Sequence, residues 1–393
     1  MPRLKPALAR QQLNPIFRIG ARVYGRDDVL HLEFGEPDFP TPAHISAAAV
    51  ASITSERQGY GPGNGLAALR TAVAARFGRV NGLTPTADQV VMTAGGTGAL
   101  MGSLLCLCSP GDVVLTPNPG WPGYDAMLAL AGVGRAYYPL LPEHDWQPDL
   151  DALEAAITSQ TRVLLVNSPS NPGGAVYPQE TIAALVEIAA RHDLWLLSDE
   201  CYDELIFDGR HVSPATLDTD GRVLTVGSFS KTYAMTGWRI GWVIAPPAVA
   251  SALGLATTAQ INNLPLCVQR AALAALGGPQ ECVAEMRAAY RERRDFATEL
   301  LRERGLLEYI PAGAFYLLVP VARAAGYNLD EPFDTLAFAE ALITERGIAL
   351  APGGVFGSGA ARYVRVSLAS APEVLRKGIS GLLDFAASWR QHE

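Results

Sequence analysis

The sequence predicts an α/β protein with a three-layer, mostly parallel seven-stranded sheet in a large domain and a smaller α+β domain. Three observations lead to this class. Between residues 90 and 245, short apolar runs alternate with Ala- and Leu-rich stretches. Two of these runs, Val163–Val166 and Leu194–Leu197, are continuously apolar, as in strands covered on both faces. The chain has 393 residues, more than a single hydrophobic core usually serves.

The expected sheet binds its ligand at one edge. Its strands are expected at Val90–Thr93, Asp112–Thr116, Arg135–Leu140, Arg162–Val166, Leu194–Ser198, Arg222–Gly227 and Ile240–Ala245. Helices at Ala99–Cys108, Gly123–Leu130, Pro148–Ile157 and Pro178–His192 separate most of them. Too few residues lie between Gly227 and Ile240 for a crossover helix, so the last strand is expected to be antiparallel. Its start then lies beside the carboxyl ends of the parallel strands, where open α/β sheets bind ligands.

Beyond residue 280 the pattern changes, which predicts the smaller domain. The segments expected there are a charged amphipathic helix at Glu281–Arg304, an apolar segment at Phe315–Val319, a helix at Thr335–Arg346, a strand at Tyr363–Leu368 and a closing helix. We therefore expect residues 46–280 to form the large domain and 281–393 the small one. Residues 1–45 would supply an N-terminal arm and part of the small domain. Pro2, Pro6 and Pro15 are expected to interrupt any helix in residues 1–26.

The composition argues against several classes of partner. A net charge of −8 disfavours nucleic-acid binding through phosphate contacts. The five cysteines are odd in number and lack the spacing of a metal site, which indicates reduced thiols in a cytoplasmic protein without a metal. The uncharged stretch Val90–Gly111 contains Pro110 and several glycines, so it does not have the continuous apolar helix of a membrane span.

Two loops follow predicted strands at the ligand-binding edge. Gly95–Gly98 (Gly-Gly-Thr-Gly) joins a strand to a helix, where a glycine backbone and a helix start favour an anion. This is either a phosphate cradle or an ordinary tight turn. A dinucleotide site is disfavoured because the next strand ends at Leu115–Pro117 without the required acid. Asn167–Gly174 follows another apolar strand, although its residue types also make simple turns.

Two charged groups lie at the same edge. Asp199 and Glu200 follow an apolar run, and a buried carboxylate needs a cation or a hydrogen-bond donor. The alternative is an acid that caps a helix.

A lysine follows the next strand. Only three of the 31 basic residues are lysines, and Lys231 is the one between two apolar strands, in Ser228–Arg239. Most lysines are solvated surface groups, but lysine can form Schiff bases and arginine cannot. Arg239 adds a bidentate anion donor at the same edge.

These four features together resemble the fold type I, aspartate-aminotransferase-like family, the class I/II enzymes that use pyridoxal 5'-phosphate (PLP). The resemblance extends from Gly35–Phe39 to Tyr363–Ser367 in the family's order, and Ser228–Gly241 is highly specific on its own. It implies transamination between an L-amino acid and a 2-oxo acid by a ping-pong mechanism, with 2-oxoglutarate and glutamate as the expected pair. It also implies a homodimer with shared active sites.

The resemblance implies a role for each matching residue. Lys231 matches the lysine that forms a Schiff base with PLP, Asp199 the acid that pairs with the ring nitrogen, and Tyr202 the tyrosine at the ring oxygen. Asn171 shares that oxygen, and Trp121 matches the aromatic residue over the ring.

The remaining matches concern the phosphate and the substrate. Those at the phosphate cup are Gly96, Thr97, Ser228, Ser230 and Arg239, with Tyr60 reaching the phosphate from the neighbouring subunit. Gly35 and Arg365 match the binding of the substrate α-carboxylate, where Trp121 and Asn171 also contact the substrate.

The sequence departs from the family at two points. Gly95 stands where serine or alanine is common, so the cup has one fewer hydroxyl donor. No arginine for a distal carboxylate can be located, which leaves the donor amino acid open. A PLP-dependent lyase on the same fold, catalysing β-elimination or ring closure, would share every cofactor residue. A non-catalytic PLP sensor would need an added DNA-binding domain, and none is expected because the family match begins near Gly35.

Overall fold

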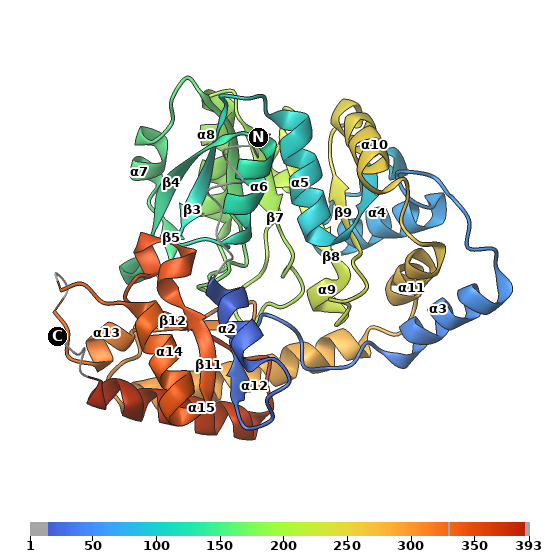
Figure 1. Cartoon of the computed structure of the whole chain (residues 1–393). Coiled ribbons are helices and arrows are strands. Elements are labelled where there is room, and N and C mark those ends of the chain that lie inside the picture. Colours follow the sequence, from blue (N-terminus) through green and yellow to red (C-terminus); the bar gives the residue numbers. More distant parts are fainter. Residues whose placement is uncertain (1–14, 329–330, 390–393) are drawn as a thin grey trace, which may run out of the picture.

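The computed structural model describes residues 15–328 and 331–389 and arranges them around two sheets (Figure 1). The large sheet has the order β2-β9-β8-β7-β6-β3-β4-β5. Its strands are β2 (Val90–Thr93), β3 (Val113–Asn118), β4 (Gly134–Leu141), β5 (Gln147–Pro148), β6 (Thr161–Asn167), β7 (Trp195–Asp199), β8 (Val223–Ser228) and β9 (Gly241–Ile244). All seven predicted strands are present. β9 runs antiparallel to both β2 and β8, as predicted.

The predicted strand number is wrong by one. β5 is an eighth strand that pairs antiparallel with β4, through Leu140–Pro148 and Leu141–Gln147. Two residues are too short to show any alternation of apolar and polar side chains, so the sequence carries no signal for this strand. Pro148 also has no backbone N–H to donate to a second neighbouring strand, which fits its position on the outermost strand.

Helices cover both faces of the large sheet, so its strands are buried on both sides (Figure 1). Along β6, Val163 and Leu165 pack into one core, while Leu164 and Val166 pack into another. The helices that belong to these layers are α5 (Gly95–Leu107), α6 (Gly123–Ala131), α10 (Pro247–Ile261), α7 (Leu150–Ala155) and α8 (Gln179–Arg191). At the β2 edge lie α3 (Ala43–Ser55), α4 (Ala67–Asn81) and α11 (Leu266–Gly277).

The small sheet has the order β1-β11-β12-β10. Its strands are β1 (Leu30–Leu32), β10 (Tyr316–Val319), β11 (Ile348–Pro352) and β12 (Val364–Ser367), and the helices beside it are α12 (Glu281–Glu303), α13 (Val321–Ala324), α14 (Thr335–Arg346) and α15 (Pro372–Ser388). β1 comes from the N-terminal region and pairs in parallel with β11. The domain boundaries at residues 45 and 280 stay a prediction.

One expectation about the N-terminal segment is wrong. Pro15 does not interrupt a helix: it is the first residue of α2 (Pro15–Val23). A proline is tolerated there because the first helical residue needs no N–H donor. Ile16, Ile19 and Val23 are buried, and α2 packs on β11. The rest of the predicted arm, residues 1–14, lies outside the described residues.

Candidate active site

A cavity of about 640 Å³ lies where the carboxyl edge of the large sheet faces β10 and β12. All of the predicted site residues except Tyr60 line it. They are Gly35, Gly96, Thr97, Trp121, Asn171, Asp199, Tyr202, Ser228, Ser230, Lys231, Arg239 and Arg365. Strand register explains part of this convergence, because Gly241 at the start of β9 pairs with both Thr93 and Ser228. Arg239 therefore lies beside the two loops that leave β2 and β8.

Glycines at the start of α5 make room for the Arg239 guanidinium. Gly95 has a φ of 73°, and a Cβ there would lie 2.7 Å from Arg239 Nη2. A Cβ on Gly241 would lie 2.6 Å from the Gly95 carbonyl carbon. The departure from serine or alanine at Gly95 thus has a steric reason in this chain. The helix start and the guanidinium together form a cradle for an anion.

Lys231 lies in the short helix α9 (Phe229–Thr232) that follows β8. The Ser228 hydroxyl caps this helix by accepting from Ser230 N at 3.1 Å, and it donates to the Ser230 hydroxyl at 2.9 Å. Lys231 Nζ donates to the Gly35 carbonyl at 2.5 Å. Burial lowers the pKa of Lys231 to about 8. About a tenth of this amine is therefore unprotonated and nucleophilic at pH 7, and about half at pH 8.

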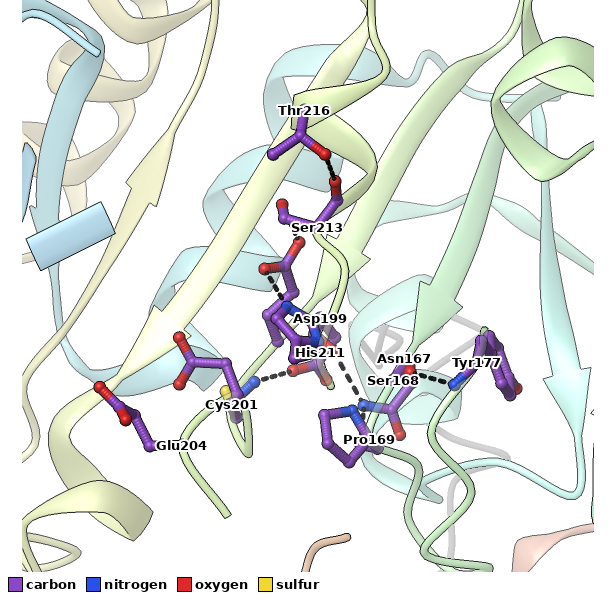
Figure 2. Close-up of polar contacts among 12 residues, drawn as sticks. Asn167, Ser168, Pro169, Tyr177, Asp199, Cys201, Glu204, His211, Ser213 and Thr216 are labelled. Atoms are coloured by element: carbon purple, nitrogen blue, oxygen red, sulfur yellow. Dashed lines mark hydrogen bonds and ion pairs between the residues drawn. The ribbon is translucent and has the colours of Figure 1, made fainter. Parts of the chain in front are cut away.

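Asp199 ends β7 as a buried carboxylate. It accepts from the Tyr124 hydroxyl at 2.9 Å and from Cys201 N at 3.3 Å, and burial raises its pKa. Asn167 donates to the Asp199 carbonyl at 3.0 Å, which joins the ends of β6 and β7 (Figure 2). No ion pair joins Asp199 to any described residue. A buried acid of this kind suits a ligand that carries a positive charge or an N–H donor.

Arg365 lies on β12 at the opposite end of the cavity. Its guanidinium carbon lies 4.4 Å from the centre of the Tyr316 ring and 4.9 Å from that of Phe356. Arg365 Nη1 donates to Asn171 Oδ1 at 3.0 Å, and Nη2 donates to the Glu33 carbonyl at 2.6 Å. Nε is buried and has no hydrogen-bond partner among the described residues, and burial lowers the pKa of Arg365. A buried guanidinium without a carboxylate partner suits an anionic substrate group.

The remaining predicted residues lie between these two ends. The hydroxyls of Tyr202 and Tyr316 are 2.7 Å apart, and burial raises the pKa of Tyr202. The Trp121 ring packs edge-on against Tyr124 at 5.4 Å. A Cβ on Gly35 would overlap the Tyr316 hydroxyl, which explains why this position needs glycine. Tyr60 lies outside the cavity and is 90% exposed.

The observed groups fit PLP, the cofactor that the sequence leads us to expect. The cradle at Gly95–Thr97, Ser228, Ser230 and Arg239 suits its phosphate. Asp199 suits its ring nitrogen, because this carboxylate is buried without a cation. Lys231 offers an amine with a depressed pKa.

Sequence reasoning missed several lining residues. Tyr316 and Tyr124 position Tyr202 and Asp199, and a single tyrosine in an apolar run such as Tyr316–Val319 is a weak signal that could have indicated the first. Ile16 and Phe17 of α2 also line the cavity. They were missed because Pro15 was interpreted as a helix breaker.

Comparison with known proteins gives a consistent result. Residues 27–382 match the model of a family described as aminotransferase class I and II. The arginine–pyruvate transaminase of Pseudomonas aeruginosa is 38% identical over 363 residues, which cover 92% of this chain and 91% of that protein. The structure of aspartate aminotransferase from Thermus thermophilus with maleate superposes with a TM-score of 0.90 at 35% identity, covering 98% of this chain and 100% of that one. An aromatic aminotransferase from Pyrococcus horikoshii gives a TM-score of 0.86 at 33% identity, covering 94% and 98%.

Proposed function

Because this chain belongs to the class I and II aminotransferase family and is a PLP-dependent transaminase, we propose that its amino donor is an L-amino acid with an uncharged, apolar side chain. The composition of the cavity wall carries this proposal. Phe17 and Phe34 are large apolar residues that line the cavity while 59% and 39% exposed, and Ile16 and Val355 lie with them. Among the described lining residues, the cations are Lys231, Arg239 and Arg365. The names of the related proteins span arginine, aspartate and aromatic substrates, so family membership alone does not fix the donor.

The proposal assigns a task to each group in the cavity. Arg365 binds the substrate α-carboxylate, and Lys231 is the site of covalent cofactor attachment and moves the α-proton. Asp199 holds a proton at the ring nitrogen, while Tyr202 and Asn171 contact the ring oxygen. Bound PLP supplies an electron sink for negative charge at the substrate α-carbon. The acceptor is a 2-oxo acid, with 2-oxoglutarate expected from the sequence. The distal carboxylate of 2-oxoglutarate would need a cation other than Lys231, Arg239 and Arg365.

A homodimer belongs to the same proposal. Tyr60 is 90% exposed, and Leu255 and Ile261 of the neighbouring α10 are 73% and 39% exposed. The Tyr60 segment approaches α10 closely, since a Cβ on Gly63 would overlap the Thr258 hydroxyl and lie 3.3 Å from the Asn262 carbonyl. Exposed apolar side chains gathered in this way are typical of an interface. A second copy of the chain would cover them.

A cytoplasmic location is the last part of the proposal. All five cysteines are free, which suits a reducing compartment. Among the described residues, no helix has the length and apolar character needed to cross a membrane.

A substrate panel tests the proposed donor and acceptor. The holoenzyme is given each L-amino acid with either 2-oxoglutarate or pyruvate, and both products are measured. We expect apolar and aromatic donors to have the highest kcat/KM. A preference for aspartate or arginine would contradict the apolar assignment without affecting transamination. Oxo-acid release beyond one equivalent per active site without any acceptor would instead indicate a lyase.

A further inference from the structure

A second groove of about 530 Å³ lies between the loop 206–211 and α12. It shares no described lining residue with the cofactor cavity. Arg287 and Arg291 lie one turn apart on the face of α12 that forms one wall, while Arg210 and His211 belong to the loop that forms the other. The transaminase chemistry uses none of these four side chains.

The groove is basic in a protein that is acidic overall. Its lining carries three guanidinium groups and one imidazole against one carboxylate, Glu292, while the whole chain has a net charge of −8. Arg210 donates to Gln179, and Arg291 donates to the Phe207 carbonyl. Arg287 has no hydrogen bond or ion pair with a described residue, although Glu204 is within electrostatic reach. A guanidinium in this state is free to bind an anion.

His211 contributes a buried nitrogen that has no partner in the part of the chain that the structure describes. Its Nε2 lies 2.8 Å from Glu200 Oε2, and the other oxygen of this fully buried carboxylate accepts from the Ser213 hydroxyl at 2.7 Å. His211 and Ser213, both labelled in Figure 2, belong to the segment that connects β7 to β8. The His211 side chain is only 3% exposed, and no described residue forms a hydrogen bond with its Nδ1.

Protonation of His211, which the neighbouring Glu200 favours, makes Nδ1 a donor. Burial alone would lower the pKa of His211, but the adjacent Glu200 outweighs this effect and the pKa is raised. Both ring nitrogens of a protonated histidine are donors. A buried donor without an acceptor is costly, and a bound ligand atom would remove that cost.

We propose that this groove binds a small oxyanion, the phosphate or carboxylate group of a metabolite, on Arg287 and on Nδ1 of His211. Arg291 and Arg210 lie at the rim and add positive charge. Ala284, Ala288 and Ile206 offer an apolar surface to the body of such a molecule. The site is independent of the donor amino acid proposed above.

The test is a titration of the holoenzyme with inorganic phosphate and, separately, with acetate. Binding is followed by NMR of protein labelled with ¹³C at histidine Cε1. The resonance of His211 is the one lost in His211→Gln, a change that leaves an amide near the position of Nε2. The absorbance of the bound cofactor reports any binding in the catalytic cavity. We expect a saturable shift of the His211 resonance with at least one probe. Phosphate alone would identify a phosphate group and acetate alone a carboxylate.

Two variants on α12 separate the site from a general charge effect. Arg287→Gln should weaken binding about tenfold, since it removes a charge-assisted hydrogen bond. Arg302→Gln changes an exposed arginine outside the groove and should leave affinity unchanged. Arg287 lies on a helix surface, so its variant stays informative even if His211→Gln fails to fold. Absence of a saturable shift with both probes, or equal affinities of Arg287→Gln and the unmodified chain, would overturn the proposal.

Discussion

The two arginines at opposite ends of the cofactor cavity are held in different ways. Arg365 is 3% exposed, lies between two aromatic rings and donates two hydrogen bonds that fix its guanidinium. Arg239 is exposed, has a φ of 53° and donates from Nη1 to the Thr236 carbonyl. The chain alone therefore organises the end proposed for the substrate carboxylate. The end proposed for the phosphate is completed by what binds there.

This difference follows from where each arginine lies in the fold. Arg365 is a strand residue, so the neighbouring strands β10 and β11 fix its position. Arg239 precedes β9 in a loop with left-handed backbone, a conformation that non-glycine residues adopt at a cost. The Arg239 guanidinium therefore has few contacts of its own, and a bound phosphate would complete its hydrogen bonds. Lys231 lies between the two ends.

Replacing Lys231 should have the largest effect on turnover, because this amine is proposed both to attach the cofactor and to act on the substrate. Lys231→Ala removes the proposed attachment point and the group that moves the α-proton. We expect kcat to fall by at least about a thousandfold, measured in single-turnover assays with an active donor. Lys377→Ala is the matched control, since that lysine is exposed on α15. Borohydride reduction and peptide mapping of the unmodified enzyme should label Lys231, and label on Lys5 or Lys377 would refute the assignment.

Replacing Asp199 should lower turnover without releasing the cofactor, because Asp199 lies between the two ends of the cavity. Asp199→Asn keeps the shape of the side chain but removes the charge proposed to hold the ring-nitrogen proton. Turnover should fall about a hundredfold to a thousandfold, while the cofactor remains bound through the phosphate cradle. The measurements are kcat and cofactor content by absorbance. Near-normal turnover would exclude this role, and loss of the cofactor would mean that Asp199 is needed for its binding.

The sequence was most informative where chemistry and strand ends coincide. Asp199 and Lys231 each follow an apolar strand, so their placement at one sheet edge could be predicted from the chain. Arg365 was found through resemblance, because neither its sandwich between Tyr316 and Phe356 nor its bond to Asn171 is local in sequence.

Other features had no usable local signal. The two residues of β5 are too few to show a pattern, and Pro15 has opposite meanings inside a helix and at its start. The contribution of α2 to the cavity depends on its packing against β11. The fold and the convergence of the expected cofactor residues on one cavity were thus largely predictable, whereas the apolar wall was not.

Exchanging Arg365 or Arg239 for lysine should change different quantities: KM in the first variant and cofactor affinity in the second. Arg365→Lys replaces a fixed bidentate group with a point charge, so KM should rise by about tenfold to a hundredfold for amino acids and oxo acids alike. Arg239→Lys should instead weaken cofactor binding, by about tenfold, with little change in KM. Steady-state kinetics at saturating PLP and a PLP titration measure the two effects. If Arg365→Lys affected only one substrate class, the shared carboxylate site would be wrong.

Lys231 also predicts a pH dependence of stability in cofactor-free protein. Its pKa is about 8 in the folded chain, against an ordinary value of 10.5. The unfolded chain therefore binds more protons between these values, and folding carries a penalty that is complete below pH 8 and disappears as the pH rises to 10.5. Lys231→Met should stabilise the cofactor-free protein by about 3 kcal/mol at pH 7 and by little at pH 10.5. Urea unfolding at both pH values tests this, and a gain independent of pH would contradict the depressed pKa.

The smallest expected effect is a partial recovery of activity in mixed dimers. It tests whether a second copy of the chain completes the exposed phosphate end of the cavity. If Tyr60 completes the cradle of the neighbouring subunit, Lys231→Ala in one subunit and Tyr60→Ala in the other damage the same site of a mixed dimer. One site then combines both mutations, and the other is intact. Random exchange of equal amounts makes half of the dimers mixed, each with one intact site of two, so about a quarter of the full activity should return. The assay is turnover after mixing two variants that are each nearly inactive.

Assembly must be verified by native mass spectrometry of the mixture, because dimers that never exchange subunits would also show no recovery. Tyr60→Phe is the matched variant, since it keeps the ring that packs at an interface and removes only the hydroxyl. If that hydroxyl reaches the phosphate of the other subunit, Tyr60→Phe should assemble normally and bind PLP more weakly. With mixed dimers present, an absence of recovery would mean that Tyr60 serves its own chain. The exposure of Arg239 would then need another explanation than a missing subunit.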